Sequence, residues 1–318
     1  MGHKITLSSV IDCSAIYTNG TYVFACGRKT YLFRKDGTFV AAYKDMRYPS
    51  KIAFLSETEA IVDSGYSGSY YLIALETGEI KWSGIQKGRR MVHSTHFAVS
   101  SDGKTIYDQC LLVNGSLHVD VMQPHVGIHN FFQMKAGYRV TKNAFCDKNN
   151  RLCLMQTQVR DIEDNETQNA PIVYQCGILE VSEEYATSRW KCQWEYELCK
   201  GHHIYGTDGR YVLFEDFFVE DLLTGSVYSL LENDINAHLQ AGSFTCAYDP
   251  QKNYLTVSYY SGKRMNVVID CTKRKRIAQY ERESGSAGFK GCVVGNEFWM
   301  GTENGIMKYP FPNCDTII

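Results

Sequence analysis

The chain is a succession of short apolar runs separated by turn dipeptides. The runs are rich in Val, Ile, Thr, Tyr and Phe, residue types that favour a pleated, half-buried strand. Between them recur pairs ending in glycine, which supplies the positive φ of tight hairpins. The pairs are Asn19-Gly20, Asp36-Gly37, Thr77-Gly78, Asp102-Gly103, Asn114-Gly115, Asp208-Gly209, Thr224-Gly225, Ser261-Gly262 and Asn304-Gly305. Short strands at this spacing predict an antiparallel, all-β fold.

The predicted strands group into units of roughly 45 residues, a spacing typical of propeller blades. The units cover approximately residues 14–43, 51–83, 94–121, 130–196, 203–230, 243–280 and 288–309. The last unit has too few strands, and the strand-like run at residues 4–11 belongs to no unit. Pairing the two would complete the last unit and close a ring, which removes exposed sheet edges.

We therefore predict a single domain over residues 1–318, a seven-bladed β-propeller of four-stranded antiparallel blades. The N-terminal strand closes the last blade. Six or eight blades stay open as alternatives, because the long unit at residues 130–196 can be divided differently.

Composition and net charge argue against some classes of partner. The formal net charge of -2 lacks the cationic footprint that general nucleic-acid binding needs. We find no secretory signal and no apolar run long enough to span a bilayer, so we expect no membrane contact. The 12 cysteines contain no C-x-x-C pair and suit a reducing compartment. The expectation is a cytoplasmic monomer.

Two kinds of segment resemble known propeller repeats. Residues 73–82, IALETGEIKW, resemble the repeat of quinoprotein-type propellers, in which a Thr-Gly turn is followed by a tryptophan on the return strand. Residues 96–104 and 203–210 are similar to the opening of a WD-type repeat. The resemblance implies the propeller fold. It brings no cofactor, since no set of quinone-binding residues is evident. Trp82 and Trp299 are expected to pack between blades.

Histidines recur near the first strand of successive predicted units. In a propeller this strand lines the central channel, so equivalent positions on neighbouring blades converge. Imidazoles meeting there could ligate a first-row transition metal, with Asp63, Glu215 or Asp216 adding a carboxylate. The four candidate metal ligands are His96, His129, His203 and His238. The alternative is that each histidine only hydrogen-bonds within its own blade.

A second set of residues suits an anionic ligand. Arg89 and Arg90 lie in the loop before the third predicted unit, and arginine forks match carboxylate or phosphate. His93 and His202 are the other candidate ligand-binding residues. A solvated loop pair is the alternative for the arginines. The basic run at residues 273–276 is interpreted as a solvated hairpin turn of the sixth unit.

Three classes of function stay open. The first, which we favour, is a binding propeller that presents a site for a protein, peptide or glycan partner on one face around the channel. The second is a metal-dependent lyase or hydrolase with the histidines at the channel mouth. The third is a structural repeat protein without a small-molecule site. The sequence contains no Gly-x-Ser-x-Gly elbow that would indicate a serine hydrolase.

Overall fold

The structure is a computed structural model. It describes residues 2–8, 15–49, 51–64, 69–85, 91–100, 103–112, 117–124, 127–133, 138–146, 152–158, 172–180, 189–198, 204–206, 211–214, 218–221, 226–232, 244–249, 251–260, 264–282 and 291–312. For residues 91–98 and for the strands between residues 108 and 220, the backbone alone is described. Regular structure in these ranges is entirely β, and none of them contains a helix that could cross a membrane.

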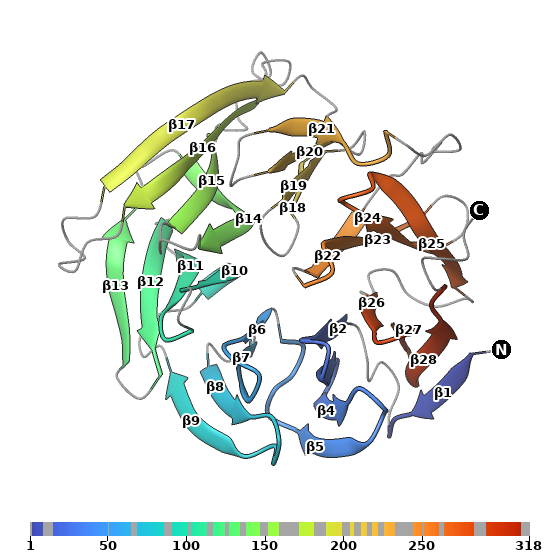
Figure 1. Cartoon of the computed structure of the whole chain (residues 1–318). Coiled ribbons are helices and arrows are strands. Elements are labelled where there is room, and N and C mark those ends of the chain that lie inside the picture. Colours follow the sequence, from blue (N-terminus) through green and yellow to red (C-terminus); the bar gives the residue numbers. More distant parts are fainter. Residues whose placement is uncertain are drawn as a thin grey trace. The chain divides into compact units, whose positions relative to one another are not determined.

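The described strands pair into seven antiparallel sheets of four strands each (Figure 1). The first sheet holds β2 (Ala15–Thr18), β3 (Tyr22–Cys26), β4 (Thr30–Arg34) and β5 (Phe39–Tyr43). The second holds β6 (Lys51–Phe54), β7 (Glu59–Ser64), β8 (Ser69–Ala74) and β9 (Ile80–Ile85). The third holds β10 (Met91–Val99), β11 (Ile106–Leu112), β12 (Leu117–Gln123) and β13 (Gly127–Gln133).

The fourth sheet holds β14 (Tyr138–Cys146), β15 (Leu152–Gln158), β16 (Ile172–Glu180) and β17 (Arg189–Leu198). The fifth holds β18 (Ile204–Gly206), β19 (Tyr211–Phe214), β20 (Phe218–Asp221) and β21 (Val227–Ser229). The sixth holds β22 (Phe244–Asp249), β23 (Tyr254–Tyr260), β24 (Arg264–Asp270) and β25 (Lys275–Arg282). The last holds β26 (Gly291–Val294), β27 (Glu297–Thr302), β28 (Gly305–Pro310) and β1 (His3–Thr6).

The boundary between the third and fourth sheets corrects the sequence prediction. The predicted fourth unit starts at residue 130, but β13 pairs with β12 and so ends the third sheet. The fourth sheet begins only at Tyr138. A strand pattern shows that a segment is extended, yet the sheet it joins is decided by long-range pairing that the local pattern does not carry.

The N-terminal strand lies at the edge of a sheet that is otherwise built from C-terminal residues. β1 pairs antiparallel with β28, with His3 opposite Lys308 and Thr6 opposite Gly305 (Figure 1). Beyond the strand, the Leu7 amide donates to the Asn304 carbonyl at 3.1 Å. The two ends of the described chain are thus held together by backbone hydrogen bonds.

The chain divides into two compact units. One comprises residues 1–66, 73–81 and 229–318, and the other comprises residues 67–72 and 82–228. The first unit contains all of β1–β7 and β22–β28, and its side chains form the cores described next. The second contains all of β10–β20.

Two apolar cores hold the sheets of the first unit together. One joins the first and last sheets; its buried members are Ile16, Val23, Ala25, Tyr31, Phe33, Cys292, Val294, Trp299 and Ile306. Ile5 and Leu7 pack against this core, so the N-terminal segment shares it. The other joins the sixth and last sheets through Val268, Ile277, Val293, Phe298 and Met300. Burying each large side chain stabilises the fold by about 1.5–3 kcal/mol.

Several glycine turns have the predicted geometry. φ is 86° at Gly20, 92° at Gly37, 74° at Gly78 and 71° at Gly103. At Gly78 the space is also closed, because a Cβ there would lie 2.4 Å from the Ala41 Cβ. Only glycine allows this turn of the second sheet to pack on β5 of the first.

Candidate functional site

Most of the predicted site residues lie outside the described part of the chain. Strand β10 contains His93 and His96, and β13 contains His129, but only the backbone of these strands is described. The other candidates fall outside the described residues altogether: Arg89, Arg90, His202, His203, His238, Glu215 and Asp216. Convergence of the histidines on a metal therefore stays a prediction.

The position of His129 differs from the predicted one. It lies in β13, the fourth strand of the third sheet, opposite Val121 of β12. The sequence placed it at the opening of the fourth unit, on a strand expected to line a channel. Among the side chains that the structure describes, no three His, Cys, Asp or Glu residues gather as a metal site would require.

Asp63, the carboxylate proposed beside the histidines, is fully buried in the second sheet. It lies on β7, where its Cα is paired with that of Lys51 on β6. The neighbouring Ser64 is also buried, and its hydroxyl donates to the Asp45 carbonyl at 3.5 Å. This hydrogen bond links the end of β7 to the segment that follows β5.

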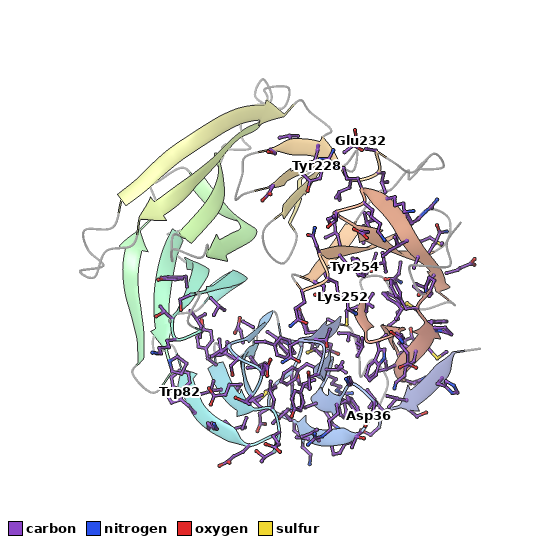
Figure 2. All side chains as sticks on the ribbon, viewed as in Figure 1. Asp36, Trp82, Tyr228, Glu232, Lys252 and Tyr254 are labelled. Atoms are coloured by element: carbon purple, nitrogen blue, oxygen red, sulfur yellow. The ribbon has the colours of Figure 1, made fainter. Side chains whose placement is uncertain are left out.

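A buried lysine joins the first and last sheets, and sequence reasoning missed it. The Lys308 Nζ lies 4.1 Å from the centroid of the Trp299 ring and 3.6 Å from the Glu297 carboxylate. It also donates to the Asp36 carbonyl at 3.4 Å. Asp36, which is labelled in Figure 2, lies in the β4–β5 turn. The Trp299 indole N–H donates to the same Glu297 carboxylate at 3.1 Å. These contacts join the last sheet to the turn of the first.

The basic run at residues 273–276 lies partly in a turn and partly in β25, and its first two side chains have ion-pair partners. Residues 271–274 connect β24 to β25, as the sequence predicts. Lys273 lies 3.7 Å from the Asp270 carboxylate, and Arg274 forms an ion pair with Glu232. These pairings give no support to a nucleic-acid site.

The turns at one end of the second sheet carry several glutamates, and we call them the acidic lobe (residues 55–59 and 75–81). The Ser56 hydroxyl accepts hydrogen bonds from the amides of Thr58 and Glu59, both at 3.1 Å. The Leu75 amide donates to the Thr58 carbonyl at 2.8 Å and so joins the two turns. The Leu75 side chain is fully buried beneath them.

The acidic lobe is docked on β5 of the first sheet. The Tyr43 hydroxyl donates to the Gly78 carbonyl at 2.8 Å, and burial raises the pKa of Tyr43. Within the lobe, Lys81 binds the Glu59 carboxylate at 2.7 Å, and this contact raises the pKa of Lys81. The carboxylates of Glu57, Glu76 and Glu79 belong to residues exposed on the lobe surface.

Two large apolar side chains of these elements are exposed. Phe39, at the start of β5, is 57% exposed and packs edge-on against Phe33 of the core shared with the last sheet. Ile80, at the start of β9, is 44% exposed. On β5, Val40 Cγ1 lies 3.4 Å from where a Gly78 Cβ would be.

Comparison with known proteins gives no family by sequence. No protein family model matches the chain, and no curated protein is significantly similar to it. The solved structures that are similar over nearly the whole length include the following two. Kuenenia stuttgartiensis hydrazine synthase has a TM-score of 0.62 at 12% identity, covering 95% of this chain and 96% of that one. The Cps50 (Swd1) beta-propeller domain of Myceliophteria thermophila has a TM-score of 0.61 at 9% identity, covering 98% and 100%.

Identity this low shows the fold alone and transfers no activity. The resemblance seen in residues 73–82 agrees with the structure, since a Thr-Gly turn joins β8 to β9 and Trp82 lies on the return strand. All-antiparallel four-stranded sheets and these structural neighbours together identify the fold as a β-propeller.

Proposed function

We propose that the chain is an interaction propeller, a rigid ring that presents a site for a protein partner on its turns. In this proposal the seven sheets are the blades of one closed ring, and β1 completes the last blade. The antiparallel pairing of β1 with β28 supports the closure, and the core shared by Ile5 with the first sheet supports it further.

The observation that carries the binding role is the contrast between interior and turns. The strands of the first unit bury two apolar cores, whereas many of its exposed charged side chains lie on turns that backbone hydrogen bonds fix. Rigid, solvent-facing turns lose little conformational entropy when a partner binds. A scaffold of this kind suits recognition, because loops vary while the sheets hold them in place.

Affinity purification with the whole chain as bait tests the proposal. A chemically cross-linked bait should enrich a defined protein, and the purified pair should bind with a measurable Kd in calorimetry. The matched control is the same chain after denaturation and alkylation, which exposes the same side chains without the fold. Equal enrichment by the folded and denatured chains would contradict a fold-dependent binding function.

A further inference from the structure

A short segment with two prolines follows the pairing of β28. We call residues 310–312, Pro-Phe-Pro, the proline strap. Pro310 is the last residue paired with β27, where it lies opposite Glu297. Because proline has no N–H, the strap has one amide to donate, that of Phe311. This amide donates to the Asn296 carbonyl, at 2.9 Å, in the β26–β27 turn.

Side chains of the sixth sheet contact the strap from the other side. The Tyr280 hydroxyl on β25 donates to the Pro310 carbonyl at 3.1 Å. The Phe311 ring packs against Tyr254, which begins β23 and is labelled in Figure 2, with ring centroids 6.1 Å apart. Both tyrosines pack on the core that the sixth and last sheets share, and Phe298 of that core stacks on Tyr280. We call Tyr254, Tyr280 and Phe298 the aromatic platform.

The strap is held in the way that a bound peptide is held. One aromatic anchor, Phe311, packs on the platform, while one carbonyl and one N–H of the strap form hydrogen bonds with groups outside it. Pro310 is exposed, and Phe311 and Pro312 are half-buried. The prolines restrict the backbone in advance, so that little conformational entropy is lost when such a segment binds. The strap therefore indicates the chemistry that the platform accepts, an aromatic residue between two prolines.

We propose that the proline strap is an autoinhibitory contact, which covers a binding site for a segment of the same chemistry in a partner protein. This inference rests on the proposed interaction function and names the partner's class and its place of binding. The aromatic residue of the partner takes the position of Phe311 against Tyr254, and a carbonyl beside it accepts the Tyr280 hydroxyl. The strap lowers the partner's apparent affinity, because only molecules whose strap has left the platform can bind it.

A full-length variant with a weakened strap tests the inference. Phe311→Ser removes the anchor. The probe is a fluorescein-labelled peptide, Gly-Tyr-Pro-Phe-Pro-Gly, and binding is measured by fluorescence anisotropy. The variant should bind this peptide at least about tenfold more tightly than the unmodified chain does, because its own strap competes less. A peptide with Ala in place of Phe should bind neither protein.

Three further variants locate the site. The matched control, Phe39→Ser, makes the same change at an exposed position of the first sheet and should bind the peptide as the unmodified chain does. Adding Tyr254→Ala to Phe311→Ser should weaken binding about tenfold, and adding Tyr280→Phe should weaken it about fivefold through loss of one hydrogen bond. Cooperative melting, followed by circular dichroism, identifies the variants that are folded.

A measurement on the unmodified chain does not rely on the folding of any variant. A probe peptide with p-benzoylphenylalanine in place of Phe, irradiated with an excess of the chain, should cross-link to β23 or β25, as mapped by mass spectrometry. Cross-links confined to other elements would overturn the platform as the site. Equal affinity of the Phe311→Ser and Phe39→Ser variants for the probe would do the same.

The outcomes separate this inference from the proposed function. A partner obtained by affinity purification should bind Phe311→Ser more tightly than the unmodified chain, and then both stand. If that partner binds the two proteins and a Tyr254→Ala variant with equal affinity, the interaction function stands and the inference fails. If the folded chain enriches no partner while Phe311→Ser binds the probe peptide, the covered peptide site stands and the interaction function fails.

Discussion

Single residues decide how the last sheet is attached to its neighbours. The Tyr280 ring stacks on Phe298 with centroids 4.4 Å apart, and its hydroxyl donates to the Pro310 carbonyl at 3.1 Å. Burial raises the pKa of Tyr280 from 10.0 to about 12. In alkaline solution the unfolded chain therefore loses this proton first. The stability that neutral Tyr280 contributes is complete below pH 10.0 and is lost as the pH rises through about 12.

The raised pKa of Tyr280 leads to a prediction about stability at alkaline pH. The free energy of unfolding, measured by urea titration at a series of alkaline pH values, should fall as the pH rises from about 10 to 12. In Tyr280→Phe it should fall less steeply, because the variant has no proton to lose at this position. Tyr43, whose pKa is raised by burial as well, keeps part of the slope in both proteins. Identical slopes for the two proteins would contradict the assignment.

Residue contacts also show where sequence reasoning stops. Trp299 is expected to pack between blades, and it does lie in the core shared by the first and last sheets. Its partner Lys308 could not be predicted, because an exposed lysine and a buried one look alike in a strand pattern. The contact of Lys308 with Asp36 spans 272 positions of the chain, and the sequence around either residue does not predict it.

At the scale of elements, loss of β1 should lower the stability of the fold by more than its short length suggests. It supplies four residue pairs to β28 and brings Ile5 to the core between the first and last sheets. Deleting residues 1–8 opens the β28 edge and exposes that core, so the melting temperature should fall by roughly 5 °C or more. Circular dichroism recorded during heating measures this melting temperature.

The exposed residue Lys4 offers a control for this prediction, because it lies on the same strand. Lys4→Ser should leave the melting temperature unchanged, whereas Ile5→Ser should reproduce part of the loss. A truncated protein that melts at the original temperature would show that β1 adds nothing to the fold.

Strands were predictable where a glycine-containing dipeptide with a strong turn preference separates them. The Asn19-Gly20, Asp36-Gly37 and Thr77-Gly78 turns connect strands as expected, with positive φ at each glycine. The third sheet was harder. The connection between β12 and β13 contains Pro124 but no glycine dipeptide, and β13 begins with a pattern that would suit either neighbouring sheet.

For the whole molecule, the sequence indicated a propeller but not how its charged turns are arranged. The histidine positions drew attention to the connections between units, most of which lie outside the described residues. The acidic lobe carried a signal that could have been used, since Glu57, Glu59, Glu76 and Glu79 fall in two turns of one predicted unit. What the sequence could not give is that both turns join through the Leu75 amide and dock on β5.

The proposed closure of the ring makes a prediction about the whole chain. β1 and β28 are antiparallel neighbours, with His3 opposite Lys308, so a short Gly/Ser linker between the present termini would connect them as an ordinary hairpin. New termini opened between β5 and β6 would then leave every blade with its four strands. Such a circular permutant should fold and melt cooperatively within a few degrees of the original, as measured by calorimetry.

The stability of the permutant should be compared with that of a variant lacking one complete sheet. Removing residues 15–43 takes away β2–β5, half of the core that contains Trp299, and the strand on which the acidic lobe rests. A closed ring cannot lose a blade without exposing the facing sides of two others, so this protein should aggregate or melt far below the permutant. If the deletion folds as well as the permutant, the sheets do not depend on one another as blades of a single ring must.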